Sequence, residues 1–264
     1  MNKENMSSAA TSSQKHARDL DFWEKRAPAF ANHAKKTRYA NEFLKLMTPE
    51  PDWTILDMGC GGGSLAIPLS SRVRKITAVD FSPSMIAIVK RICGEKNITN
   101  IETILGEWDD NWSRLGIGTY DVAMASRSLR AENCEPYIRK LMHAAQRRVY
   151  ISAPVGSGPI DTRMLEFAGR KTSHKSDYRQ FLSVFEKLGI RANLDFIEEN
   201  HSNRWLSLED AVKDNHWMFF GITPEEEEKL RIYMKENLIQ TDSGVQLEYE
   251  RICRWAVMWW EQGR

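Results

Sequence analysis

Short apolar and β-branched runs alternate with amphipathic stretches through the middle of the chain. Runs of this length, separated by segments of helical periodicity, are typical of strands joined by crossover helices. The strands that we predict are Thr54–Met58, Lys75–Val79, Glu102–Leu105, Asp121–Ala125 and Arg148–Ser152. The helices predicted between them are Ser64–Ser71, Pro83–Cys93 and Glu135–Ala145. The alternation predicts an α/β fold with a doubly wound, mostly parallel sheet and helices on both of its faces.

Residues at the ends of the predicted helix over 83–93 support its placement. Ser82 can cap the N-terminus, and Pro83 fits the first helical position, where a missing N–H costs little. We expect Gly94 to end this helix, because glycine adopts the left-handed C-cap conformation without strain.

A helical region is predicted before the sheet. Apolar residues recur every three or four positions from about 17 to 47, Pro28 is expected to divide this stretch into two helices, and Pro49 and Pro51 end it. We therefore expect an N-terminal helical cap over residues 17–50. Residues 1–16 are polar and lack the apolar stretch of an export signal, which predicts a disordered tail and a cytoplasmic protein.

The second half of the chain has a looser pattern. A helix is predicted near Tyr178–Leu188 and a strand near Arg191–Ile197. Helix starts at Ser207 and at Thr223 then indicate a helical insertion at about 207–240 within a domain that spans 51–264. The aromatic and β-branched segment Leu247–Trp260 is predicted to be the last strand, at the edge of the sheet.

Charge and composition exclude several classes of function. The chain has 37 Lys and Arg against 36 Asp and Glu, so it lacks the broad basic surface of a dedicated nucleic-acid binder. No apolar run approaches the roughly 20 residues that span a bilayer, and we expect no membrane partner. The 4 cysteines and 6 histidines show neither a CxxC pair nor metal-ligand spacing, so we predict no metal site and no disulfide framework.

The segment that indicates chemistry is a glycine-rich turn after the first predicted strand. It reads TILDMGCGGGS over residues 54–64, with Asp57 inside the strand. Its pattern is D-x-G-x-G-x-G, and Ser64 stands where the dinucleotide fingerprint requires glycine. The Asp57 carboxylate would also repel a pyrophosphate, whereas it would attract the ammonium and sulfonium of S-adenosylmethionine. Sequence and charge therefore favour S-adenosylmethionine as the cofactor.

ILDMGCGGG followed by ITAVDFSPSM resembles the first two motifs of the class I S-adenosylmethionine-dependent methyltransferases. The resemblance covers about Trp53–Pro154 and implies a seven-stranded Rossmann-like sheet. It implies that Gly59, Cys60 and Gly61 pass beneath the methionine part of the cofactor, with Asp57 near its amino group. Asp80 would accept hydrogen bonds from both ribose hydroxyls, since two carboxylate oxygens match two adjacent donors.

The same resemblance implies further cofactor contacts. Phe81 and Met85 would press on the adenine face, while Ser126 would lie near the methionine moiety. Gly106, Glu107 and Trp108 would occupy the loop that holds the adenine edge. The family more often has Asp where Glu107 stands, which weakens the expected contact of that residue with the adenine amino group.

The acceptor is expected to be a small molecule, methylated by direct in-line displacement. The segment after the fourth predicted strand, ASRSL, differs from the signatures used on nucleic-acid amines and pyrimidine carbons. An RNA or protein methyltransferase is the alternative within enzymes. A non-catalytic sensor or scaffold, with Trp255–Trp260 contacting a partner, is the alternative outside them. No catalytic residue is assigned, although His33 and His174 are candidate bases, and we expect a monomer or a homodimer.

Two hypotheses concern the acceptor pocket. The N-terminal helices and the insertion are expected to form a lid over the acceptor pocket, with Trp23, Arg26 and Phe30 as its candidate residues, and packing of these residues on the core is the alternative. A basic cluster after the fifth strand would fit an anionic acceptor, although a solvated surface is the alternative. Its members are Arg170, Lys171, His174, Lys175 and Arg179.

Overall fold

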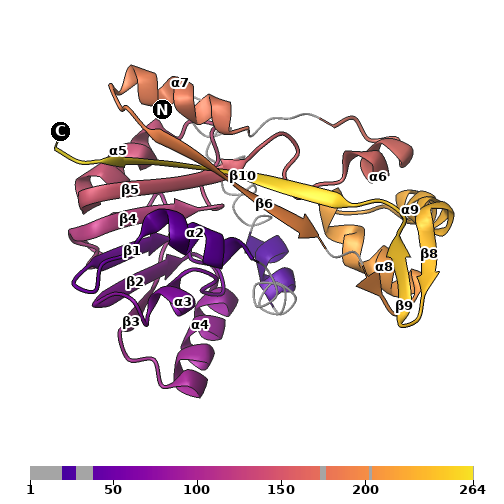
Figure 1. The fold of residues 1–264 in the computed structure, drawn as a ribbon, viewed down its shortest axis with the longest axis horizontal. Coiled ribbons are helices and arrows are strands. Elements are labelled where there is room, and N and C mark those ends of the chain that lie inside the picture. The colour runs from indigo at the N-terminus through magenta and orange to yellow at the C-terminus, as the bar shows by residue number, and fades with distance from the viewer. Residues whose placement is uncertain (1–19, 28–37, 173–176, 202–203, 264) are drawn as a thin grey trace, which may run out of the picture.

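A seven-stranded mixed sheet forms the centre of the protein in the computed structural model, which describes residues 20–27, 38–172, 177–201 and 204–263 (Figure 1). The strand order is β3-β2-β1-β4-β5-β10-β6. Strands β1 to β5 pair in parallel, and β10 runs antiparallel to both β5 and β6. The strands are β1 Thr54–Met58, β2 Lys75–Asp80, β3 Ile101–Leu105, β4 Tyr120–Ser126, β5 Ala145–Pro154, β6 Asn193–His201 and β10 Arg251–Glu261. The predicted doubly wound α/β fold is confirmed.

Helices cover both faces of this sheet, because successive strand residues point to opposite sides. In β1, Ile55 belongs to the apolar core beneath α2, α3 and α4, whereas Leu56 belongs to the core beneath α5 and α7. The helices on the first face are α2 Tyr39–Met47, α3 Ala66–Leu69 and α4 Pro83–Lys96. Those on the second face are α5 Glu135–Ala144 and α7 Tyr178–Lys187.

The start of α4 is confirmed and its predicted end is wrong. The Ser82 side chain accepts a hydrogen bond from the Met85 backbone N–H, and Pro83 is the first helical residue. The helix continues through Gly94 to Lys96, and Asn97 takes the left-handed conformation at φ 53°. Asparagine tolerates this conformation through its short polar side chain, so the helix ends without glycine.

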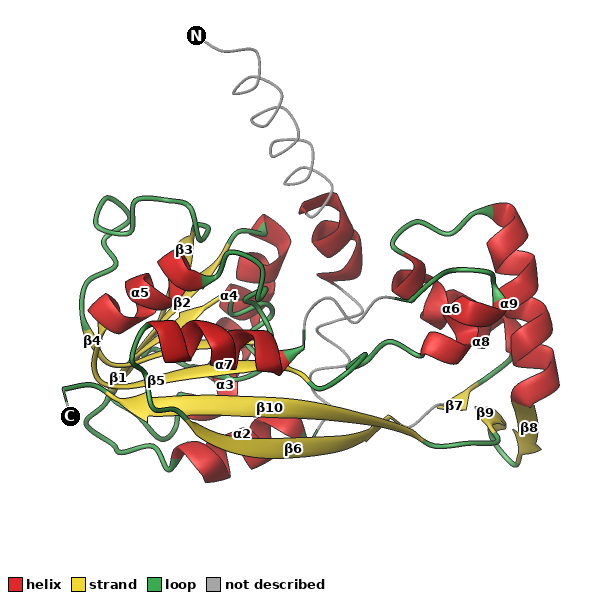
Figure 2. Cartoon of the chain, turned by 90° about the horizontal axis from the view of Figure 1, so that it is seen from above, coloured by secondary structure: helices red, strands yellow, loops and turns green. Residues whose placement is uncertain are grey.

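A separate lobe lies beyond the ends of β6 and β10, as Figure 2 shows. Its helices are α6 Thr162–Phe167, α8 Leu208–Asn215, the 3₁₀ helix η1 His216–Phe219 and α9 Pro224–Asn237. They share a core that includes Met164, Phe219 and Leu230. Ser207 caps α8 and Thr223 forms a capping box with Glu226 at α9, so both predicted helix starts are confirmed. The sequence did not indicate the small sheet of β7 Arg204–Trp205, β8 Leu238–Thr241 and β9 Gly244–Leu247.

The prediction that the last strand lies at the sheet edge is wrong. Strand β10 is inserted between β5 and β6, so β6 forms that edge, and Leu247 belongs to β9. The physical reason is visible in β10, where four consecutive residues, Trp255 to Met258, are buried. A strand that is covered on both faces needs this continuous apolar run, whereas a half-exposed strand would alternate.

Some expectations concern residues that the structure does not describe. The tail over 1–16, Pro28, Phe30 and His33 lie outside the described residues, as do His174 and Lys175. Among the residues that are described, no helix is long and apolar enough to cross a bilayer, and no group of acids, histidines and cysteines could hold a metal ion.

Candidate functional site

The glycine-rich turn lies at the carboxyl edge of the parallel strands, between β1 and α3, and is bonded to the end of β2. The backbone N–H groups of Gly59 and Cys60 both donate to the carbonyl of Val79, at 2.8 and 2.9 Å. The N–H of Gly61 donates to the Asp80 carboxylate at 2.8 Å. Gly59 and Gly61 have φ of 74° and 53°, which other residues adopt only under strain. The turn therefore joins the two predicted motifs.

Gly59 is required by space as well as by backbone conformation. A Cβ built at this position would lie 2.3 Å from Cβ of Ser128. Ser128 itself is held in place because its hydroxyl donates to the carbonyl of Met58 at 2.7 Å. Any side chain at 59 would therefore push apart the ends of β1 and the segment after β4.

Asp57 and Asp80 place two buried carboxyl groups beside this turn. Burial and, second to it, the charge of Asp80 raise the pKa of Asp57 to about 7, against the opposing effect of the Arg127 charge. Burial also raises the pKa of Asp80, against hydrogen bonds from the backbone of Ser82, Gly61 and Phe81. Neither carboxylate forms an ion pair with any described residue. The site is therefore suited to a ligand that brings positive charge or hydrogen-bond donors.

The other predicted residues near the turn are held by different contacts. The N–H of Gly106 donates to the carbonyl of Asp80 at 3.0 Å, so the loop after β3 is brought to the same edge. Met85 is buried at the start of α4, and Phe81 is half-buried between Asp80 and that helix. The Cys60 thiol is buried, which raises its pKa well above the usual value and keeps it protonated.

Glu107 and Trp108 follow Gly106 along that loop. The N–H of Glu107 donates to the Asp110 carboxylate at 2.9 Å, and its side chain is half-buried. The ring of Trp108 packs against Trp112 and Tyr137, with centroids 5.8 and 5.4 Å away. The indole of Trp108 therefore belongs to an aromatic group beside α5.

Ser126, at the end of β4, is part of a buried hydroxyl cluster. The Tyr39 hydroxyl lies 2.8 Å from the Ser126 oxygen and 2.6 Å from that of Ser152. Ser126 therefore links the N-terminal helix α2 to strands β4 and β5.

Sequence reasoning missed Arg127, which follows Ser126. Its φ is 58°, a strained value for a residue with a side chain. The guanidinium lies 4.0 Å from the centroid of the Tyr39 ring, and its Nη2 lies 3.4 Å from the Ser64 hydroxyl at the end of the turn. Glu199 is at 4.0 Å, the limit of an ion pair. The only sequence signal was a charged residue directly after a buried strand.

A helix over residues 20–27 connects this edge of the sheet with the lobe. Its Glu24 accepts hydrogen bonds from the Ser82 hydroxyl and from the backbone and hydroxyl of Ser84, at the N-terminus of α4. On the lobe side, the ring of Phe22 stacks on Phe220 with centroids 5.0 Å apart. Trp23 and Arg26, the described members of the predicted lid, lie on this helix.

Two members of the predicted basic cluster form ion pairs within the protein. Arg170 forms an ion pair with Glu226 at 2.6 Å, and Arg179 forms one with Asp177 at 3.0 Å. The first pair connects the segment after α6 with α9, and the second lies at the N-terminus of α7. The sequence pattern did not indicate these contacts.

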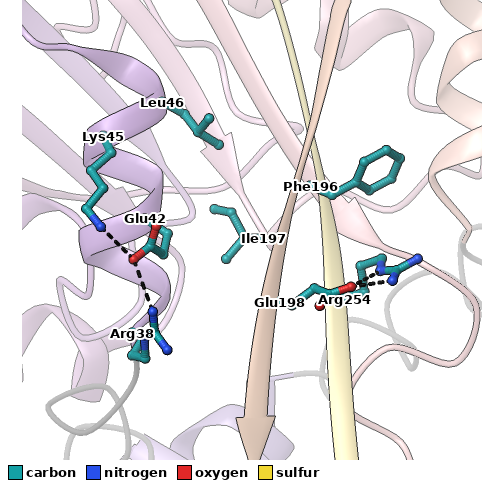
Figure 3. Close-up of a pocket in the computed structure, with 8 residues that line it drawn as sticks. All are labelled: Arg38, Glu42, Lys45, Leu46, Phe196, Ile197, Glu198 and Arg254. Atoms are coloured by element: carbon teal, nitrogen blue, oxygen red, sulfur yellow. Dashed lines mark hydrogen bonds and ion pairs between the residues drawn. The ribbon is translucent and has the colours of Figure 1, made fainter.

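A surface cavity of about 570 Å³ lies between α2 and the strands β6 and β10 (Figure 3). Its charged residues pair with one another: Glu42 with Lys45 and Arg38, and Glu198 with Arg254. No residue of the glycine-rich turn lines it. We therefore place the candidate site at the turn, where the buried carboxylates lie.

Comparison with known proteins finds methyltransferases among the similar sequences and structures. Residues 55–149 match the family model described as a methyltransferase domain. The chain is 27% identical over 249 residues to an uncharacterized protein of Haemophilus influenzae, covering 92% of this chain and 89% of that one. It is 23% identical over 197 residues to a ubiquinone biosynthesis O-methyltransferase of Rickettsia conorii, covering 68% and 66%. A crystal structure of a candidate methyltransferase from Bacillus halodurans has the same fold, with a TM-score of 0.58, 12% identity and coverage of 85% and 99%.

Gly59→Ala is expected to abolish binding of S-adenosylhomocysteine, because the new Cβ collides with Ser128. Gly116→Ala is the matched control, since Gly116 has φ of 77° but no atom within 4 Å of the new Cβ. Backbone strain should cost each variant about 1–2 kcal/mol of unfolding free energy, and the collision with Ser128 should add to the loss in Gly59→Ala. Only Gly59→Ala should lose ligand heat in titration calorimetry. Wild-type affinity in Gly59→Ala would contradict the assignment.

Ligand affinity is expected to depend on pH through Asp57. Its raised pKa of about 7 means that the carboxyl group of the free protein is mostly protonated at pH 6 and mostly ionised at pH 8. A ligand ammonium that pairs with Asp57 would require the ionised form, so the Kd for S-adenosylhomocysteine should be about tenfold weaker at pH 6 than at pH 8. Asp57→Asn should bind weakly and with a flatter pH profile in the same titration. A wild-type Kd that is constant over this range would exclude the role of Asp57.

Proposed function

The chain carries a class I S-adenosylmethionine-dependent methyltransferase domain, and from this premise we propose that it methylates a small-molecule acceptor by direct in-line displacement. The observation that carries the small-molecule assignment is the helix over 20–27. It is bonded through Glu24 to the start of α4 and packed through Phe22 on the lobe, beside the edge where Asp80 lies. A cover at this place favours an acceptor that can be enclosed over one that is a long polymer.

The proposed cofactor contacts follow from the charges at the turn. Asp57 would face the ammonium group, and Asp80 would accept from the ribose hydroxyls. The buried position of both carboxylates and the raised pKa of Asp57 support this, because a cationic ligand offsets the cost of keeping that group ionised. Gly59 and Gly61 let the backbone approach the ligand closely.

Arg127 would bind the carboxylate at the same end of the cofactor. Its guanidinium lies next to Ser64, and its charge acts on Asp57. The Asp57 carboxylate and the Arg127 guanidinium, at the same end of the turn, would pair with the ammonium and the carboxylate of an α-amino acid. This arrangement supports a zwitterionic ligand rather than a purely cationic one.

The protein's own contribution to the reaction would be orientation and exclusion of water. S-adenosylmethionine, when bound, supplies a methyl group that is already activated on a sulfonium. Holding two reactants in line contributes about 7–11 kcal/mol in favourable cases, so no strong catalytic side chain is required. The helix over 20–27 and the lobe would keep solvent from the reacting atoms. The ubiquinone biosynthesis relative, named for methyl transfer to oxygen, supports a small acceptor.

Methyl transfer is tested by incubating the purified protein with methyl-labelled S-adenosylmethionine and an extract separated into metabolites, RNA and protein. We expect label in the metabolite fraction. Gly59→Ala should transfer none, and Gly116→Ala should transfer as the wild type does, because only the first loses the cofactor turn. Label in RNA or protein alone would replace the small-molecule assignment by the corresponding alternative. The absence of label from all three fractions would favour a sensor.

Arg127→Met is expected to lose discrimination between S-adenosylmethionine and its decarboxylated form. The wild type should prefer the carboxylate-bearing ligand roughly ten- to a hundredfold, the size of a charge-assisted hydrogen bond. The methionine side chain keeps apolar contact with Tyr39 and Trp255, so the fold should persist. Titration of each protein with each ligand gives the four affinities, and an unchanged preference in Arg127→Met would remove this role.

A further inference from the structure

The Arg26 guanidinium packs among aromatic rings, and two of its nitrogen atoms have no hydrogen-bond partner. The guanidinium carbon lies 4.3 Å from the centroid of the Trp217 ring in η1 and 5.3 Å from that of Phe22. Its Nε and Nη1 atoms are fully buried and make no hydrogen bond. Buried donors of a charged group are costly when they are unpaired, and their presence in a folded protein calls for a ligand or another explanation.

The described residues provide no counter-ion for this charge. Burial lowers the pKa of Arg26 to about 10, and the charge of Asp214 only partly opposes that effect. The Asp214 carboxylate accepts a hydrogen bond from the Trp205 indole at 2.9 Å and does not come within ion-pair distance of Arg26. Within 20–27, 38–172, 177–201 and 204–263 the guanidinium thus has aromatic neighbours but no anion.

The position of Arg26 places this charge between the domain and the lobe. Residues two apart on a helix point about 200° away from each other, so Glu24 and Arg26 project from opposite sides of the helix. Glu24 is bonded to Ser82 and Ser84 beside the proposed ribose site. Arg26 faces Trp217 of the lobe. The unpaired N–H groups are therefore on the side of the helix that faces the lobe, opposite the side that is bonded beside the proposed ribose site.

We propose that Arg26 binds an anionic group of the acceptor, a carboxylate or a phosphate, through Nε and Nη1, with the surrounding rings contacting its apolar part. The inference rests on the proposed function and names the chemical class of its substrate. It assigns to Arg26 the role that the basic cluster around Arg170 and Arg179 was expected to have. Those two arginines pair with Glu226 and Asp177, whereas Arg26 forms no ion pair with any residue that the structure describes.

A purely structural Arg26, held only by its cation–π contacts, is the competing explanation, and the two differ in their response to anions. We would measure the thermal midpoint of the full chain in chloride and in inorganic phosphate at equal pH and ionic strength. Phosphate should raise the thermal midpoint of the wild type by a few degrees. Above the Kd, the midpoint should increase with the logarithm of the phosphate concentration. Arg26→Met should lose this response.

The matched control is Lys25→Met, which removes an exposed neighbouring charge and should keep the wild-type response. Titration with S-adenosylhomocysteine shows that each variant is folded, because its site does not include residue 25 or 26. A phosphate response retained in Arg26→Met, or absent from the wild type, would overturn the inference.

The product of the labelling experiment provides a second readout. We expect the labelled metabolite to bind an anion exchanger, and a neutral or cationic product would overturn the role of Arg26. Label that enters only RNA or protein would instead refute the proposed function, while the phosphate response would still report on Arg26 by itself. The two failures are thereby distinguishable.

Discussion

The bond from the Gly61 N–H to the Asp80 carboxylate is the contact on which the site depends. It attaches the turn after β1 to the end of β2, while the Val79 carbonyl accepts from Gly59 and Cys60 beside it. These bonds form only if the turn adopts left-handed backbone angles, which the glycines permit. The D-x-G-x-G pattern is therefore a condition for bringing the ends of β1 and β2 together, before any ligand is considered.

That attachment places two buried carboxyl groups near each other, and neighbouring residues offset only part of the resulting electrostatic cost. Burial raises the pKa of both Asp57 and Asp80, and the charge of Asp80 adds to the rise at Asp57. Arg127 opposes the shift at Asp57, but Arg127 also interacts with Glu199 and with the Tyr39 ring. The free protein thus holds more negative than positive charge at this edge. A ligand with an ammonium group would correct the imbalance, which is why cofactor binding and site charge are linked.

The sequence predicted most of the sheet and the turn, because their signals are local. Strand β1, the Ser82 cap and the position of Asp80 at a strand end each depend on residues within a few positions. What it could not predict depends on contacts between distant segments. Tyr39 meets Ser152, Arg170 meets Glu226, and β10 enters between β5 and β6 only once the chain has folded. Gly94 shows a local limit as well, since a glycine that can end a helix need not do so.

The proposed function of the helix over 20–27 also depends on contacts between distant segments. The carboxyl ends of parallel strands lie at one edge of the sheet, so segments that enclose an acceptor there must extend beyond that edge. Here one face of a short helix is bonded to α4 through Glu24, and the other is packed on the lobe through Phe22 and Arg26. A movement of the lobe relative to the sheet would therefore have to break the aromatic contacts at Trp217 and Phe220 or the hydrogen bonds from Ser84 to the Glu24 carboxylate. The contacts at Arg26 leave donors unpaired, so this is the side on which a bound anion would strengthen the closed arrangement.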